Sequence, residues 1–183
     1  MAAPWFKVVA LKRNHMLVPI LALISIAFDQ ITKFIVSTSL PLYGAWSPFP
    51  GPNPFFQIVY VYNTGAAFGL FKDLGTVFVL IALVVVGAIV YYSRRLTRGQ
   101  WLLRTALGLQ LGGALGNLID RVRLGHVIDF IDVGIGNTRW YTSNLADVSI
   151  VAGVILLGCA MWRDERQQKK SKTGDVGMSS LQN

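Results

Sequence analysis

Four apolar runs, separated by polar segments, dominate the chain. They cover about residues 16–36, 76–92, 101–119 and 148–162. A helix of roughly 20 apolar residues spans the hydrocarbon of a bilayer. We therefore predict an all-α integral membrane protein with four transmembrane helices.

The polar segments between these runs contain two strand patterns. Residues 57–62 and 127–133 are rich in β-branched and aromatic side chains, which favour strands. The loop at 39–54 is proline-rich and uncharged, which argues against helix. Residues 66–71 are apolar but too short to cross a membrane, so we expect them to lie at its interface. These segments predict a small extracytoplasmic, β-rich cradle with an interfacial segment.

Composition and charge support this plan. The chain is 53% hydrophobic and 14% charged, whereas a soluble domain carries about 25% charged residues. Most of its 17 Lys and Arg residues flank the apolar runs, so the net charge of +8 reflects membrane topology and not nucleic-acid binding. The positive-inside rule then places both termini in the cytoplasm. We expect a cytoplasmic N-terminal segment at 1–15, a membrane domain at 16–162 and a disordered basic tail at 163–183.

The first apolar run has the basic start of a cleavable signal peptide and a small-x-small match at Ser25-Ile-Ala27. However, the apolar stretch continues well past that match, to a length that spans a bilayer. We therefore interpret it as the first transmembrane helix.

Two carboxylates at the outer edge of the predicted membrane domain are the main candidates for chemistry. Asp120 ends the third helix and Asp147 begins the fourth, at the same expected depth. Gly108, Gly112 and Gly116 recur every four residues and permit close helix approach. If this face brings the two helices together, the carboxylates meet. Two adjacent carboxylates cannot both stay ionised, so one can act as a base toward water while the other polarises a carbonyl.

Each of these groups also has a structural interpretation. Asp120 could pair with a nearby arginine and simply end its helix. Asp29 and Lys33 are four residues apart and could neutralise each other. Asp129 alone could be a structural group of its strand. Three asparagines could serve as turn and cap residues, or could hold the carboxylates or a substrate main chain: Asn63, Asn117 and Asn144.

Other functional classes fit less well. A proton-coupled transporter would place carboxylates at several depths, whereas the middle of each predicted helix has no acidic residue. A non-catalytic binding or assembly factor stays open. With two histidines and one cysteine, no metal site is expected. A Ser–Lys dyad would need Lys33, whose nearest outer serines lie in a plain loop. Cys159, within an apolar run, is expected to be a buried thiol.

Five ordered motifs resemble those of the prolipoprotein signal peptidase family, also called lipoprotein signal peptidase or signal peptidase II. They are DQITK at 29–33, YNTGAAFG at 62–69, GGALGNLIDR at 112–121, GHVIDF at 125–130 and NLAD at 144–147. The resemblance implies an aspartic endopeptidase of the bacterial plasma membrane that needs no cofactor, with Asp120 and Asp147 as its catalytic pair near the outer face. Ser143 departs from the family, which commonly has an aromatic residue there.

The resemblance also implies a substrate and supporting residues. The substrate would be a diacylglyceryl-modified prolipoprotein, cleaved just before its lipidated cysteine, and globomycin-type cyclic peptides would block the site. Asp29 and Lys33 would brace the first helix. The residues expected to line or support the site are Asn63, Gly65, Asn117, Arg121, Asp129 and Asn144.

Overall fold

The fold is that of a computed structural model, which describes residues 16–49, 51, 54–65, 75–97, 99–135 and 138–179. For 164 and 167–179 only the backbone is described. The predicted N-terminal segment at 1–15 and the predicted interfacial segment at 66–71 lie outside these residues.

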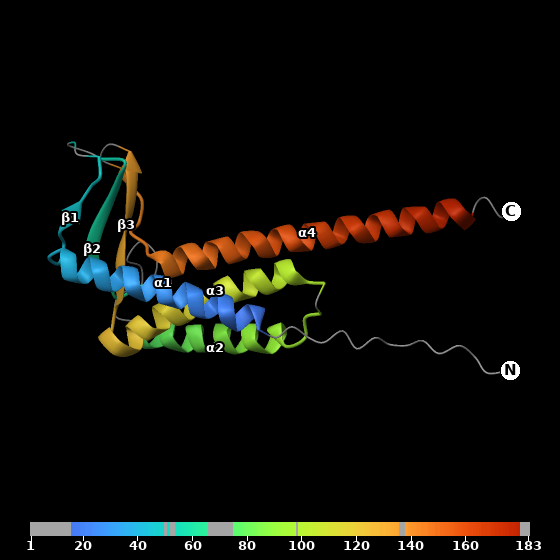
Figure 1. Ribbon diagram of the computed structural model, residues 1–183, viewed down its shortest axis with the longest axis horizontal. Coiled ribbons are helices and arrows are strands. Elements are labelled where there is room, and N and C mark those ends of the chain that lie inside the picture. The colour runs from blue at the N-terminus through green and yellow to red at the C-terminus, as the bar shows by residue number, and fades with distance from the viewer. Residues whose placement is uncertain are drawn as a thin grey trace.

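Helices form at all four predicted apolar runs. They are α1 (Leu17–Ser39), α2 (Gly75–Ser93), α3 (Trp101–Leu124) and α4 (Leu145–Ser179). The central helix is α3, which packs against α1, α2 and α4 (Figure 1). By length and composition, α1, α2 and the Leu145–Arg163 part of α4 could each cross a membrane, whereas α3 is not among these candidates. The lower hydropathy of α3 fits its central position: it carries polar side chains, and the surrounding helices bury several of them.

A four-stranded antiparallel sheet stands at one end of the helices (Figure 1). Its order is β1 (Ala45–Trp46), β2 (Phe56–Asn63), β3 (Val127–Ile135) and β4 (Thr138–Arg139). The two predicted strands are confirmed as β2 and β3. Their register pairs Val61 with Asp129 and Asn63 with Val127. Paired residues lie on the same face of a sheet, so Asn63 and Asp129 both face the helix ends.

The glycines of α3 contact a different helix from the one expected. A methyl group at Gly112 would lie 2.8 Å from the Ala22 carbonyl oxygen of α1, and Gly108 approaches Leu21 of the same helix. The close approach to α4 instead uses Gly113, which faces the Ala146 backbone. The expectation that the four-residue glycine repeat joins α3 to α4 was therefore wrong for most of its length: it joins α3 to α1.

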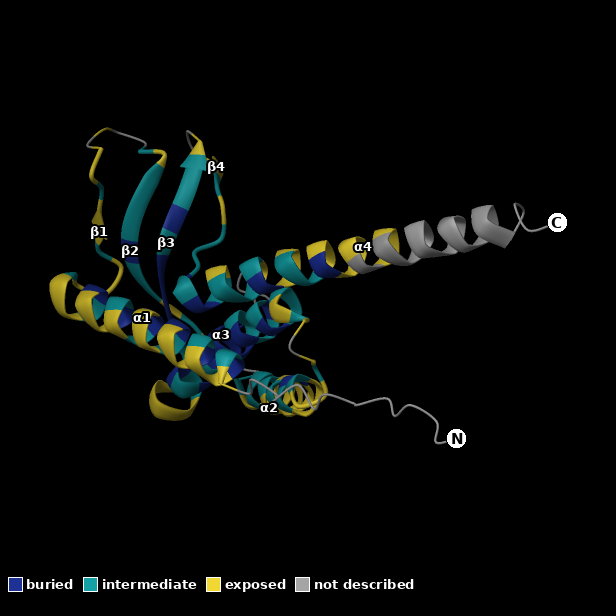
Figure 2. Ribbon diagram, turned by 45° about the vertical axis from the view of Figure 1, so that its right-hand side comes forward, coloured by how far each residue is buried: buried dark blue, intermediate teal, exposed yellow. Residues whose placement is uncertain are grey.

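The C-terminal end of α3 turns the chain back over the helix ends. Gly125 has a φ of 78°, in the left-handed region, and its N–H donates to the Arg121 carbonyl. Glycine adopts this conformation without the steric cost that a Cβ imposes. The chain then enters β3 at Val127. Buried residues gather where α1, α3, β3 and the start of α4 meet (Figure 2).

Two expectations for α4 differ from the structure. The helix continues to Ser179, although we expected a disordered tail from residue 163. Extending an existing helix needs no new nucleation, and Arg, Glu, Gln and Lys are good helix formers. Cys159 is exposed on this helix, whereas we expected a buried thiol.

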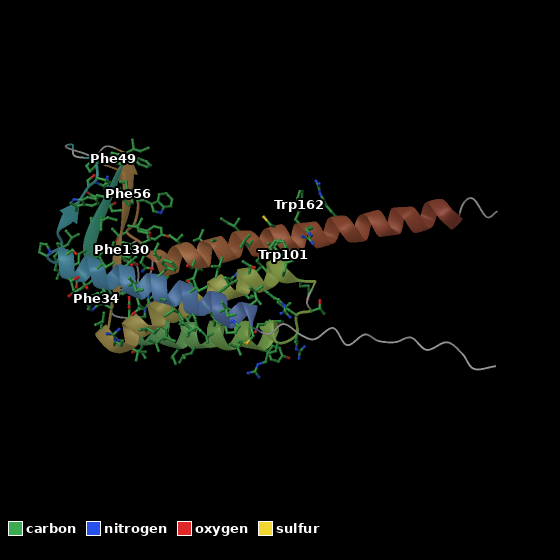
Figure 3. The ribbon with its side chains drawn as sticks, viewed as in Figure 1. Phe34, Phe49, Phe56, Trp101, Phe130 and Trp162 are labelled. Atoms are coloured by element: carbon green, nitrogen blue, oxygen red, sulfur yellow. The ribbon has the colours of Figure 1, made fainter. Side chains whose placement is uncertain are left out.

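Aromatic side chains mark the two ends of the helix bundle. Figure 3 shows Trp101 and Trp162 toward the end away from the sheet, whereas Phe34, Phe49, Phe56 and Phe130 lie at the sheet end. Tryptophans concentrate where a membrane meets water. The separation of these groups gives the bundle two chemically distinct ends.

Candidate active site

A buried lysine joins three polar residues at the sheet end of the bundle. The Lys33 Nζ atom lies 2.8 Å from Asp29 Oδ2 and 2.7 Å from Asp120 Oδ2. It also donates to Asn117 Oδ1 at 3.2 Å. The Lys33 side chain is only 2% exposed, so its charge needs these partners. The predicted pairing of Asp29 with Lys33 is confirmed.

Asp120 is enclosed by hydrogen-bond donors. Besides Lys33, it accepts a hydrogen bond from Gln30 Nε2 at 2.9 Å and from the Ile128 backbone N–H at 3.3 Å. Its ion-pair partner is therefore Lys33 and not a nearby arginine, as the sequence had also allowed. Its partners hold α1, α3 and the start of β3 together at this point.

The start of α4 is a reciprocal cap. The Asp147 N–H donates to Asn144 Oδ1 at 3.0 Å, and the Asn144 N–H donates to Asp147 Oδ2 at 3.3 Å. This arrangement is a capping box, here with Asp in place of Glu at the third helical position. Asp29 Oδ1 accepts the Ala146 N–H at 2.9 Å. The cap fixes the position of the Asp147 carboxylate relative to α1 and α3.

Two asparagines connect the carboxylates. Asn117 Oδ1 accepts from Lys33 and from Asn144 Nδ2, so the Asn117 amide nitrogen is directed to Asp147 Oδ1, at 2.8 Å. Asn144 Nδ2 also donates to Asp129 Oδ1 at 2.6 Å. Asn144 thus contacts both Asp129, through its side chain, and Asp147, through its backbone N–H.

Asp129 is buried on the inner face of β3. Its side chain accepts a second hydrogen bond from Asn63 Nδ2 at 2.8 Å. Burial, reinforced by the nearby Asp147 charge, raises the pKa of Asp129 to about 7, although the bonds from Asn63 and Asn144 oppose this. Near neutral pH, Asp129 is therefore partly protonated.

A cavity of about 200 Å³ lies between β2, β3, α3 and α4. Its polar lining residues are Asn63, Asn117, Arg121, Asp129, Tyr141 and Asp147. Val127, Ile150 and Val151 line the apolar part, together with Gly65. Asp120 does not line this cavity. The expectation that Asp120 meets Asp147 was therefore wrong in geometry, because Asp120 is turned toward Lys33 on α1, and Asp129 takes its place beside Asp147.

Arg121 lies at the edge of the same cavity. Its guanidinium donates to the Gly65 carbonyl at 3.3 Å and to the Asn117 carbonyl at 3.4 Å. The loop after β2 is shaped by Asn63, whose Oδ1 accepts the Gly65 N–H at 3.0 Å. This places one cation next to the two cavity carboxylates, where it can hold a negatively polarised group.

The structure brings most of the predicted site residues together. Six of them line the cavity: Asn63, Gly65, Asn117, Arg121, Asp129 and Asp147. The other four do not line it but belong to the hydrogen-bond and ion-pair network next to it: Asp29, Lys33, Asp120 and Asn144. Sequence reasoning missed Gln30, which contacts Asp120, and Tyr141, which lines the cavity. Gln30 lies between Asp29 and Lys33 in a helix that is mostly apolar, and this was the available signal. Among the described residues, no group of three or more His, Cys, Asp or Glu side chains could hold a metal ion.

Two comparisons of sequence identify relatives of this chain. Residues 21–163 match the family model described as signal peptidase (SPase) II. A lipoprotein signal peptidase of Geobacter metallireducens is 41% identical over 163 residues, covering 87% of this chain and 99% of that protein. A lipoprotein signal peptidase of Bacillus subtilis is 43% identical over 157 residues, covering 86% of this chain and 100% of that protein.

Solved structures agree with these matches. A bacterial membrane enzyme determined by the in meso method at 2.3 Å resolution superposes with a TM-score of 0.75 at 34% identity, covering 84% of this chain and 92% of that chain. A second such structure, at 1.9 Å resolution, gives a TM-score of 0.71 at 33% identity, covering 84% and 97%. With three helices apolar enough to span a bilayer, the protein is a membrane protein. The chain belongs to the signal peptidase II family of membrane proteases.

Proposed function

We propose that the protein is an aspartic endopeptidase that removes the signal peptide from diacylglyceryl-modified prolipoproteins. Cleavage falls just before the lipidated cysteine. The observation that carries this proposal is the cavity in which Asp129 and Asp147 lie beside each other. The relatives named lipoprotein signal peptidase support the choice of substrate.

The catalytic pair in this proposal is Asp129 and Asp147. The sequence patterns and the family resemblance both pointed to Asp120 as the partner of Asp147, but Asp120 is saturated by Lys33, Gln30 and the Ile128 N–H and is absent from the cavity lining. Asp120 is instead a positioning residue that holds the first helix against the third. Two neighbouring carboxylates share one proton, and the titration belongs to the pair.

The pair can perform peptide hydrolysis without a cofactor. The ionised carboxylate takes a proton from water, and the water oxygen bonds to the scissile carbonyl carbon. The protonated carboxyl gives its proton to the carbonyl oxygen, which forms a neutral tetrahedral diol. The diol then collapses: the carboxyl that took the water proton gives it to the leaving nitrogen as the C–N bond breaks, and a diol hydroxyl gives its proton to the other carboxylate. The pair thus regains its starting protonation. This division of roles follows from holding two carboxylates at different protonation states.

Neighbouring groups position the substrate in this scheme. Asn117 and Asn144 fix the carboxylates, so these do not reorganise during reaction. Arg121 and Asn63, at the cavity edge, offer donors to main-chain carbonyls of the substrate. A globomycin-type cyclic peptide would occupy the same cavity, because it presents similar main-chain groups.

The membrane arrangement forms part of the proposal. All four helices cross the bacterial plasma membrane, with both termini in the cytoplasm and the cavity near the outer face. The buried polar residues of α3, Arg104, Asn117 and Asp120, are tolerated because they face the protein interior and not lipid. This placement suits a substrate whose lipid stays in the bilayer while its scissile bond lies at the surface.

A cleavage assay tests the substrate assignment. Purified protein in detergent is given a precursor peptide with a diacylglyceryl cysteine, and the same peptide without the lipid. We expect a product that begins at the lipidated cysteine by mass spectrometry, inhibition by globomycin and little turnover of the bare peptide. Equal cleavage of both peptides, or a cut elsewhere, would contradict the proposal.

Cysteine labelling tests the topology. In a Cys159→Ala background, which removes the exposed native thiol, single cysteines are placed at Ser93 and at Thr138. An impermeant maleimide added to intact cells should label the Thr138→Cys protein alone. Labelling of both positions from outside would refute the four-helix arrangement.

A further inference from the structure

The C-terminal end of α1 lies beside β2 and β3 at the sheet end of the bundle (Figure 2). A second cavity, with a volume of about 440 Å³, lies between these elements. Six apolar residues line it: Ile35, Val36, Leu40, Trp46, Ile58 and Phe130. A cavity of this size can hold part of a small apolar molecule.

This second cavity lies behind the strand that carries Asp129. Asp129 lines the proposed catalytic cavity, whereas Phe130, the next residue of β3, lines the second one. Successive side chains of a strand point to opposite faces of the sheet. The two cavities are therefore separated by β3, and a ligand that fills one does not occupy the other.

The lining of the second cavity offers no charge to a ligand. None of the described residues that line it is charged. Residues 39–54, which contribute Leu40 and Trp46 to the lining, contain no charged side chain either. The Thr32 hydroxyl, which also lines the cavity, already donates to the Phe28 carbonyl of its own helix at 2.8 Å. The cavity therefore suits a hydrocarbon group and not a polar or ionic one.

One wall of this cavity belongs to a lipid-facing helix surface. By length and composition, α1 could cross a membrane over its full range, Leu17–Ser39. Phe28, Ile31 and Ile35 are each more than half exposed and follow one another at intervals of three and four residues, so they form one apolar row. Ile35 ends this row and lines the cavity. Trp46, also exposed, has the position that tryptophan favours where a membrane meets water. The cavity is therefore continuous with the surface that faces lipid.

An apolar cavity beside lipid is best filled by hydrocarbon. Water finds no hydrogen-bond partners in a cavity with an apolar lining. An empty cavity leaves the atoms of its wall without van der Waals contacts on one side. A hydrocarbon chain supplies these contacts, and the surrounding membrane offers such chains in excess.

We propose that one acyl chain of a membrane phospholipid occupies this cavity. The lipid belongs to the leaflet at the sheet end, with its headgroup near Trp46. Its chain runs along α1 from Leu40 toward Thr32, a distance of about 12 Å at the rise of a helix. The chain is recognised by its shape and apolar character, so the headgroup has little influence. The acyl chains of a peptidase substrate are not the occupant, because β3 separates this cavity from the catalytic one.

Photolabelling of the full chain in lipid nanodiscs tests this proposal. A trace of phosphatidylcholine with a diazirine on one acyl chain is activated by light, and the labelled residues are mapped by tandem mass spectrometry. We expect labels at Phe130 as well as at Val84, which is exposed on α2. Phe130 is only 5% exposed, so lipid that merely surrounds the helices does not reach it. A phosphatidylglycerol with the same diazirine chain should give the same pattern.

A variant that fills the cavity provides the second measurement. Ile58→Trp places an indole in the cavity and should abolish the label at Phe130, while the label at Val84 remains. Ile81→Trp is the matched control, because it makes the same substitution at an exposed position of α2; it should keep both labels. A Tm close to that of the control shows that the Ile58→Trp protein is folded.

Four results would overturn the proposal. Wild-type labels confined to exposed residues would do so without any variant. An unchanged Phe130 label in a folded Ile58→Trp protein would also do so, as would a Phe130 label seen with only one of the two headgroups. Adding the diacylglyceryl precursor peptide should leave the Phe130 label unchanged, and its loss would assign the cavity to the acyl chains of the substrate. The labelling needs no peptide cleavage, so its outcome is independent of the proposed proteolysis.

Discussion

Replacing Lys33 with methionine should destabilise the protein severely while leaving the cavity carboxylates in place. One buried ammonium serves both Asp29 and Asp120, at 2.8 Å and 2.7 Å. Methionine fills a similar volume but leaves two buried carboxylates without a cation. Removing one partner of a buried ion pair costs about 3–5 kcal/mol.

We expect the total loss of unfolding free energy to stay at about 3–5 kcal/mol, although two carboxylates lose their cation. Asp29 keeps the Ala146 N–H, and Asp120 keeps Gln30 and the Ile128 N–H. For a chain of this size, about 1 kcal/mol corresponds to about 2–4 °C in Tm. The Lys33→Met protein should therefore unfold about 6–20 °C below wild type.

The assay is thermal unfolding in detergent micelles, followed by tryptophan fluorescence at one scan rate. Arg123→Gln is the control, because Arg123 is exposed and makes only a 3.5 Å contact to Gln30; it should stay close to wild type. Adding Asp120→Asn to Lys33→Met should recover part of the loss, because one stranded charge is removed. A Lys33→Met protein as stable as the control would refute this account of the buried cluster.

Three further predictions concern pH, packing and the cap. The pKa of Asp129 is raised to about 7, so kcat/KM should fall as pH rises through about 7, when the pair loses its shared proton. The His126→Gln control should show the same fall in kcat/KM. A kcat/KM that climbs steadily to pH 9 would contradict the prediction. Gly112→Val should lower stability by about 1–3 kcal/mol because the added side chain meets α1. Gly87→Val is the control and should not lower it, because the space around Gly87 is open. Equal Tm values for the two variants would refute the close approach of α3 to α1. Asn144→Ala should cost about 1 kcal/mol through the lost cap and lower kcat further, since Asp129 loses the Asn144 Nδ2 donor and Asn117, which holds Asp147, loses the same donor; a loss of stability with full kcat would contradict the bridging role.

The raised pKa of Asp129 also makes the stability of the fold depend on pH. The folded protein binds a proton at Asp129 more tightly than the unfolded chain, whose pKa is near 3.8. The stabilisation from this proton is complete below about pH 3.8 and is lost as pH rises through about 7. The contribution of Asp129 to the free energy of unfolding, measured at constant detergent, should therefore fall as pH rises from about 3.8 to about 7.

The elements of the fold were predictable because each has a strong local pattern. Apolar runs indicated the helices, and β-branched residues indicated β2 and β3. The two-residue strands β1 and β4 leave no such pattern, because they form only where the neighbouring strand offers hydrogen bonds. The end of α4 was missed for a related reason, since polar composition alone does not reveal that a helix is extended from an apolar core.

The residues of the site were predictable, but the partner of Asp147 was not. Asp120 and Asp147 are expected at one depth in the membrane, yet depth does not specify the direction of a side chain around its helix. The direction is set by Lys33, which comes from a helix about 90 residues earlier in the chain. Asp129 reaches the cavity because Gly125 reverses the chain after α3. The strand alternation alone placed Asp129 on one face without showing that this face covers the helix ends.

The most direct test of the catalytic account is the turnover number of three isosteric variants on the lipidated precursor. With the fold verified by thermal unfolding, Asp129→Asn and Asp147→Asn should each lower kcat by about 10³-fold or more, because proton transfer by a positioned side chain contributes about 10²–10⁴-fold. Asp120→Asn should keep a measurable rate, within about tenfold of wild type, because Asp120 acts through Lys33 and not on the substrate. An Asp129→Asn enzyme that turns over within tenfold of wild type, or a folded Asp120→Asn enzyme as inactive as Asp147→Asn, would contradict the assignment of Asp129 and Asp147.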